Sequence, residues 1–154
     1  HGIYYQMSSL DLPKDPLIGA LLRVPAQAIH RRIIAGLHRA GFPDLRLPHM
    51  GVLQEPATDS SRPSELAERA GMSKQAMNQL LQSLERLGYL SRRDARGDGR
   101  ARLVHFTARG HAAWAKAHEI LAEIEAEWRT TLGEKDFRRL KALLCKVWVS
   151  DLVP

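Results

Sequence analysis

Two short helices separated by a tight turn restrict the possible folds of this 154-residue chain more than any other feature. Pro63 suits the first position of a helix that Gly71 ends, and Ser73 can cap a second helix that continues to about Leu87. Gly88 follows as the residue that ends the second helix. Two short helices joined by about three residues that include a glycine form a helix-turn-helix.

A hairpin is predicted directly after the second helix. Residues 89–93 and 100–106 are interpreted as strands, because the segment 94–99 between them holds two glycines and two aspartates, a composition typical of turns. A helix-turn-helix followed at once by a β-hairpin predicts a winged helix. The expected fold class is therefore mainly α with a small β-hairpin, and residues 47–107 are assigned to a winged helix-turn-helix region.

An apolar helix is predicted before this region. Asp15 and Pro16 can cap and begin it, and Gly41 follows its last apolar turn. Pro25 falls inside the pattern and is expected to kink or split the helix. Pro48 is expected to begin a second, short helix that ends near Leu53.

Two helices after the hairpin carry apolar residues at heptad spacing. Thr107 can cap the first, and Gly133 separates it from the second. The seams are Trp114, Ala117, Leu121, Ile124 and Trp128 in the first helix, and Phe137, Leu140, Leu144 and Val147 in the second. They exceed the needs of a domain of about 75 residues, which favours a helical dimerisation region, residues 15–42 and 108–154, over packing within one chain.

Positive charge is concentrated around the helix-turn-helix. Residues 62–111 carry 10 basic and 5 acidic side chains, which accounts for +5 of the net charge of +6, and such a field attracts polyanions. No acidic residue occurs from Ser73 through Leu84. Amide side chains can pair with adenine edges and a lysine can contact guanine or phosphate, so this helix suits double-stranded DNA. The candidate contacts are Ser73, Lys74, Gln75, Asn78, Gln79 and Gln82.

The hairpin adds further candidate DNA contacts, because arginines at a loop tip can hold phosphate or enter the minor groove. They are Arg92, Arg93, Arg96, Arg100 and Arg102. Asp98 lies among these arginines, and two interpretations stay open for it. Asp98 either pairs with Arg100 and positions the tip, or it only makes the turn.

These segments together resemble the MarR family of bacterial winged-helix transcription regulators, over about residues 15–150. The resemblance is sharpest at Ser64–Ser73 and continues through Leu84–Leu90. The Asp-x-Arg of the hairpin and the Thr-x-x-Gly start of the following helix complete it. Pro25 and the Pro48–Met50 segment depart from the usual pattern of the family.

The resemblance implies a homodimer that grips a pseudopalindromic operator, as a repressor. Members of the family commonly bind aromatic or phenolic acids in a cleft between the dimerisation helices and the winged helix, so a small aromatic ligand is expected. The candidate ligand contacts are His30, His38, His49, Met50, His111 and Trp114. The alternative for each is a place in the core or at the surface.

The sequence contains no motif that is typical of an enzyme or of a metal site. No phosphate loop, nucleophile elbow, paired-carboxylate cleft or metal triad occurs, so neither an enzyme nor a metal or cofactor site is predicted. No segment approaches the roughly 20 apolar residues that span a bilayer, and a single cysteine, Cys145, fits the reducing cytoplasm. Cys145 is expected to pack among apolar neighbours, with redox sensing as the alternative. Residues 1–14 are treated as a tag remnant or a disordered N-terminus.

Two alternatives to a ligand-responsive regulator stay open. A winged helix can bind DNA constitutively, as an architectural protein does, or it can bind another protein. The acid-free helix argues against the second alternative, because that face suits a polyanion.

Overall fold

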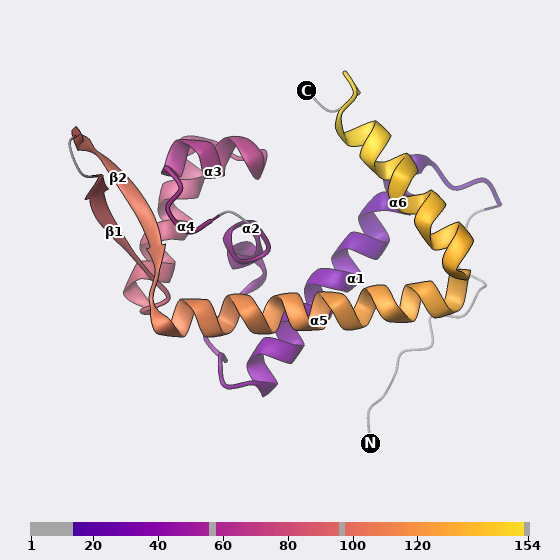
Figure 1. The fold of residues 1–154 in the computed structure, drawn as a ribbon, viewed down its shortest axis with the longest axis horizontal. Coiled ribbons are helices and arrows are strands. Elements are labelled where there is room, and N and C mark those ends of the chain that lie inside the picture. The colour runs from indigo at the N-terminus through magenta and orange to yellow at the C-terminus, as the bar shows by residue number, and fades with distance from the viewer. Residues whose placement is uncertain (1–13, 56–57, 96–97, 153–154) are drawn as a thin grey trace.

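The computed structural model describes residues 14–55, 58–95 and 98–152, without the side chains of residues 94, 95 and 98–101. The elements in this part of the chain are α1 (Ile18–Arg39), a 3-10 turn η1 (Leu47–His49), α2 (Met50–Leu53), α3 (Pro63–Arg69), α4 (Lys74–Arg86), β1 (Leu90–Ala95), β2 (Asp98–Phe106), α5 (Ala108–Leu132) and α6 (Glu134–Trp148). The predicted class, mainly α with a two-stranded hairpin, is confirmed. In Figure 1, α5 lies along the long axis of the molecule, with the hairpin at one end and α6 at the other.

Local chemistry decides where several of these elements begin and end. The hydroxyl oxygens of Ser73 and Thr107 each accept a backbone N–H from the first turn of α4 and α5, at 3.1 Å in both cases. Gly88 and Gly133 follow the two helices with a φ of 81°, a conformation that residues with a Cβ rarely adopt. The predicted caps and stops of these helices are confirmed.

The first helix differs from its prediction at two points. It begins at Ile18, not at Asp15, and no side chain caps it. It also continues through Pro25, so the helix is not split there, and the alternative of a kink stays a prediction. A proline removes one hydrogen bond and crowds the preceding turn, but it does not end this helix. The later turns of α1 pack tightly on α5. Gly36 allows this close approach, because a Cβ there would lie 2.4 Å from Cδ1 of Ile120.

One continuous hydrophobic core joins the helices to the hairpin. It contains Ile33 and Leu37 of α1, buried residues of α2 to α5, and Val104 of β2. The apolar face of α4 belongs to this core, with Met77 and Leu81 fully buried. The winged helix is therefore packed directly on α1 and α5 and does not hang from a flexible linker. No helix in the described residues is long and apolar enough to cross a membrane.

The hairpin is antiparallel, with Leu90 opposite Phe106 and a shift of register between Asp94 and Ala95. Ser61, in the segment before α3, forms an isolated bridge with Val104. The predicted hairpin is confirmed, and the bridge ties the start of the helix-turn-helix to the same sheet.

Candidate nucleic-acid interface

The polar face of α4 is exposed along its whole length. Ser73, Lys74, Gln75, Asn78, Gln79 and Gln82 all lie on the surface, while the opposite face is buried in the core. Ser73 also caps the helix. The amides and the ammonium group are therefore available to a partner outside the chain.

A groove of about 430 Å³ lies beside this face, between α3, α4 and the hairpin. Its lining residues are Arg62, Pro63, Ser64, Lys74, Asn78, Arg92 and Arg102. Four of the seven are cationic and none is acidic, which is the character of a site for backbone phosphates. The sequence interpretation missed Arg62 and Ser64. The only local signal was a basic residue directly before the proline that begins a helix.

Arg92 occupies a special place in this groove. Its Nη2 and Nε donate to Oε2 of Glu85 at 3.0 and 3.2 Å, and its Nη1 donates to Oδ1 of Asn78 at 3.4 Å. The Arg92 side chain is 17% exposed. Arg92 therefore links β1 to α4. Its guanidinium also balances the negative charge of Glu85, an acidic residue on a helix otherwise rich in amides.

The remaining hairpin candidates are only partly described. Arg93 and Arg102 have exposed side chains on β1 and β2. Arg96 lies outside the described residues, and so do the side chains of Asp98 and Arg100. Both interpretations of Asp98 therefore stay open.

The six candidate ligand contacts do not all share one environment. His30 lies against Gln54, with its Nε2 3.1 Å from Oε1, and Trp114 Nε1 donates to the carbonyl oxygen of the next residue, Glu55, at 3.3 Å. Both thus flank the segment that follows α2. Trp114 is half-buried and stacks on His118, 4.0 Å between ring centroids.

The other four candidates have different partners. His38 contacts the carbonyl oxygen of Leu45 at 2.7 Å, and Met50 is buried in the core. His111 is exposed, with its Nε2 3.9 Å from Oδ2 of Asp59.

His49 is buried between η1 and α4. Its Nδ1 accepts the backbone N–H of Arg46 at 3.0 Å. The proton of the neutral ring is therefore on Nε2, which donates to Oγ of Ser83 at 3.1 Å. Burial lowers the pKa of His49, although the charge of Asp44 opposes the shift. His49 thus serves as a neutral link between η1 and the helix with the amide face.

A second surface is apolar and lies on the other side of the molecule from the hairpin. In the single chain, the exposed apolar residues of α1 and its cap are Leu17, Ile18, Leu21, Leu22 and Val24, and those of α6 are Leu143, Leu144, Val147 and Trp148. These residues include Leu144 and Val147 of the predicted seam of the last helix. Their exposure leaves the apolar surface of α1 and α6 without cover in one chain.

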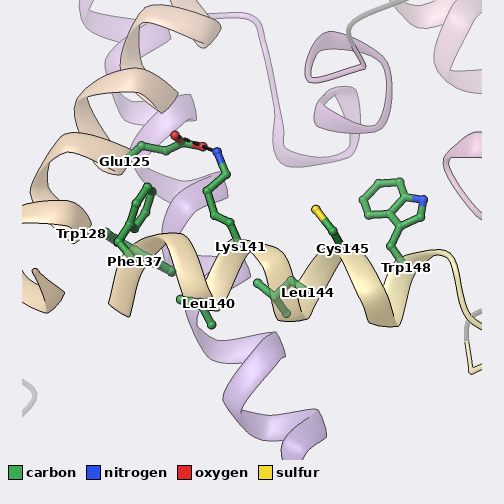
Figure 2. A pocket seen from close by; sticks show the side chains of 8 residues that line it. All are labelled: Glu125, Trp128, Phe137, Leu140, Lys141, Leu144, Cys145 and Trp148. Atoms are coloured by element: carbon green, nitrogen blue, oxygen red, sulfur yellow. Dashed lines mark hydrogen bonds and ion pairs between the residues drawn. The ribbon is translucent and has the colours of Figure 1, made fainter. Parts of the chain in front are cut away.

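Figure 2 shows a hollow of about 260 Å³ on this surface, between α5 and α6. Its lining residues are Glu125, Trp128, Phe137, Leu140, Lys141, Leu144, Cys145 and Trp148. Lys141 reaches across to Glu125, with Nζ 3.0 Å from Oε1. Cys145 lines this hollow and is exposed in the single chain, so the burial of its thiol among apolar neighbours stays a prediction. Among the residues that the structure describes, no cluster of His, Cys, Asp or Glu could hold a metal ion.

Comparison with known proteins gives consistent results. A sequence model described as the MarR family matches residues 50–101. The HTH-type transcriptional repressor Rv2887 of Mycobacterium tuberculosis (strain H37Rv) is 30% identical over 142 residues, which cover 90% of this chain and 98% of that protein. The repressor Mb2911 of Mycobacterium bovis matches equally well.

Solved structures have the same fold. The crystal structure of Mycobacterium tuberculosis Rv2887, in complex with salicylic acid, superposes with a TM-score of 0.63 at 28% identity, over 88% of this chain and 99% of that one. The S. aureus MepR–DNA complex superposes with a TM-score of 0.70 at 19% identity, over 86% of this chain and 96% of that one.

Proposed function

This chain belongs to the MarR family of transcription regulators, and from that premise we propose that it is a homodimeric repressor whose α4 helices read a pseudopalindromic operator. The observation that carries the proposal is the exposed amide face of α4 beside the cationic groove. The amides of α4 can contact base edges in the major groove of DNA, while the cationic groove of the protein holds the flanking phosphates. The cytoplasm is the compartment where such a regulator meets its operator.

The homodimer is supported by the uncovered apolar surface of α1 and α6. Burial of a half-exposed leucine or valine against a second copy is worth roughly 1–2 kcal/mol, so a surface of this extent favours association. A dimer would place its two reading helices about one DNA turn apart, roughly 34 Å.

A small aromatic acid is the proposed releasing ligand. The relative Rv2887 was crystallised with salicylic acid. In this chain, His30 and Trp114 flank the segment after α2, where an imidazole could pair with a carboxylate and an indole could stack on a ring. A ligand there would lie between α1, α5 and the winged helix, and a coupling free energy of about 1–3 kcal/mol is typical of such release. Constitutive binding without a ligand is the alternative.

In-vitro selection of duplexes from a random pool tests the proposed function. A palindrome with half-sites about one turn apart is expected. Gln75→Ala should then relax the base preference at one position. Arg62→Ala should weaken binding to all sequences and reduce the salt slope by about 1. Lys116→Ala, which removes a partly exposed charge on α5 away from the groove, is the matched control and should change neither.

Enrichment of no motif would refute sequence-specific binding and favour the architectural alternative. Titration of the bound operator with salicylic acid tests the ligand. Release by salicylic acid, lost in Trp114→Ala but kept in Lys116→Ala, is expected. Operator binding that is indifferent to aromatic acids would support the constitutive alternative.

A further inference from the structure

Three side chains from three separate segments meet at the C-terminal end of α4. Asp44 lies between α1 and η1, Tyr89 joins α4 to β1, and Arg109 lies in the first turn of α5. The Asp44 carboxylate accepts a hydrogen bond from the Tyr89 hydroxyl through Oδ1 and another from Arg109 Nη2 through Oδ2, at 2.8 Å. Arg109 Nη2 also donates to the Tyr89 hydroxyl oxygen at 3.0 Å. These residues form a closed triangle of contacts.

The surroundings hold each member of the triangle in one charge state. Burial and the hydrogen bond to Asp44 raise the pKa of Tyr89 to about 12. Burial opposes the ionisation of Asp44, but the Tyr89 hydroxyl and the Arg109 guanidinium outweigh it and hold the pKa of that carboxyl below its ordinary value. The guanidinium also lies over the Tyr89 ring, 4.6 Å from its centroid. At neutral pH the triangle is therefore a neutral phenol, a carboxylate and a guanidinium.

Backbone contacts join α4 to α5 at the same place. The Thr107 N–H donates to the Tyr89 carbonyl oxygen at 3.1 Å, and the Thr107 hydroxyl donates to the Gly88 carbonyl oxygen at 2.6 Å. Gly110 lies so close that a Cβ there would be 1.8 Å from the Tyr89 carbonyl oxygen. The end of α4 and the start of α5 thus form a joint, and the triangle adds the segment after α1 to it.

A small rotation at this joint would produce a large displacement of the exposed amide face of α4. The 13 residues of α4 span about 20 Å, so a tilt of about 10° moves the far end of the helix by about 3.5 Å. That displacement is about one base-pair step of DNA, 3.4 Å along each strand. The angle between α4 and α5 therefore determines the half-site spacing at which both α4 helices of a dimer can bind the DNA together.

We propose that Asp44, Tyr89 and Arg109 are positioning residues that set the angle of α4 on α5 and, through it, the half-site spacing that the dimer accepts. The proposal rests on the proposed function. The three residues lie at the end of α4 away from Lys74 and Asn78 of the groove, and they act through the helix. Phenylalanine would fill the same buried space as Tyr89, so the hydroxyl contributes orientation and not core volume.

Tyr89→Phe and Asp44→Asn test this proposal with small changes of shape. Binding is measured by fluorescence anisotropy to the selected operator and to duplexes whose half-sites are moved apart or together by single base pairs. In the wild type, binding should fall sharply when the spacing changes. In both variants the discrimination between spacings should fall by about three- to tenfold, the factor that one lost hydrogen bond can supply.

Glu127→Gln is the matched control. Glu127 accepts hydrogen bonds from Arg32 at 2.5 and 2.8 Å and so joins α1 to α5 without contacting α4. Its spacing profile should equal that of the wild type. Nitroxide labels on Gln79→Cys, in the Cys145→Ser background, give a second readout. The distribution of distances between the labels on the two α4 helices of the dimer should broaden in Tyr89→Phe and stay unchanged in Glu127→Gln.

A purely structural role would lower the melting temperature and weaken binding to every duplex equally, with an unchanged spacing profile, and this result would overturn the proposal. An unchanged distance distribution in Tyr89→Phe would overturn it as well. If the wild type itself selects no operator, the proposed function fails and this proposal fails with it. A sharp wild-type profile that the variants retain refutes only the positioning role.

Discussion

Gly110→Ala should destabilise this protein severely, although alanine normally favours a helix. Gly110 lies in the first turn of α5, where a Cβ would be 1.8 Å from the Tyr89 carbonyl oxygen and 2.9 Å from Cδ1 of Phe106. The nearest obstacle is backbone, which cannot rotate away as a side chain can. The first turn of α5 would therefore have to move away from the end of α4.

The cost can be estimated from what such a movement breaks. Overpacking costs about 1–3 kcal/mol, and each of the two hydrogen bonds from Thr107 to Gly88 and Tyr89 contributes about 1 kcal/mol. The higher helix propensity of alanine returns up to about 1 kcal/mol. A net loss of about 3 kcal/mol in the free energy of unfolding is expected for Gly110→Ala.

Urea unfolding followed by circular dichroism measures this loss, at one fixed protein concentration because association adds to stability. Gly51→Ala is the control: its Cβ would lie 3.4 Å from Sδ of Met72 and 3.9 Å from Cδ1 of Leu80, which are ordinary contacts with side chains, and its stability should stay within about 1 kcal/mol of the wild type. Equal urea midpoints for Gly110→Ala and Gly51→Ala would refute the close approach of α5 to Tyr89.

Two further predictions concern the ends of α4. Ser73→Ala removes the oxygen that accepts the Ala76 N–H, and should cost about 1 kcal/mol of stability, whereas Ser73→Asp should retain the cap in the same unfolding assay; equal losses in both would contradict the capping role. Since burial lowers the pKa of His49 in the folded chain, the unfolded chain binds more protons below about pH 6.5. Stability should therefore be full above that pH and fall as the pH drops through the folded pKa, and His49→Gln, which can keep both hydrogen bonds, should show a flatter profile; identical profiles would exclude His49 as the cause.

The parts of the fold that sequence could predict are those that depend on local chemistry. Ser73 and Thr107 cap their helices, and the positive φ of Gly88 and Gly133 ends them, because capping and glycine conformations depend on a few neighbouring residues. Pro25 shows the limit of this reasoning. Its local effect predicts a kink or a split, but α1 continues through it, and the later turns of α1 pack on α5 through residues far apart in the chain.

The same limit applies to the candidate interface. The exposed face of α4 could be predicted, because its period and its polarity both belong to one helix. The tie from Arg92 to Glu85 could not, since it depends on how the hairpin folds back against α4. The triangle of Asp44, Tyr89 and Arg109 joins three segments whose proximity no local pattern encodes.

The uncovered apolar surface of α1 and α6 has a consequence for how much regulator a cell can use. A newly made chain exposes this surface to proteolysis and aggregation until it pairs with a second copy. At low abundance, halving the rate of synthesis would reduce the paired form to about a quarter, because pairing depends on the square of the chain concentration. Operator occupancy would then change more than in proportion to the dose of the gene. Regulation would therefore be sensitive to the expression level of the regulator itself.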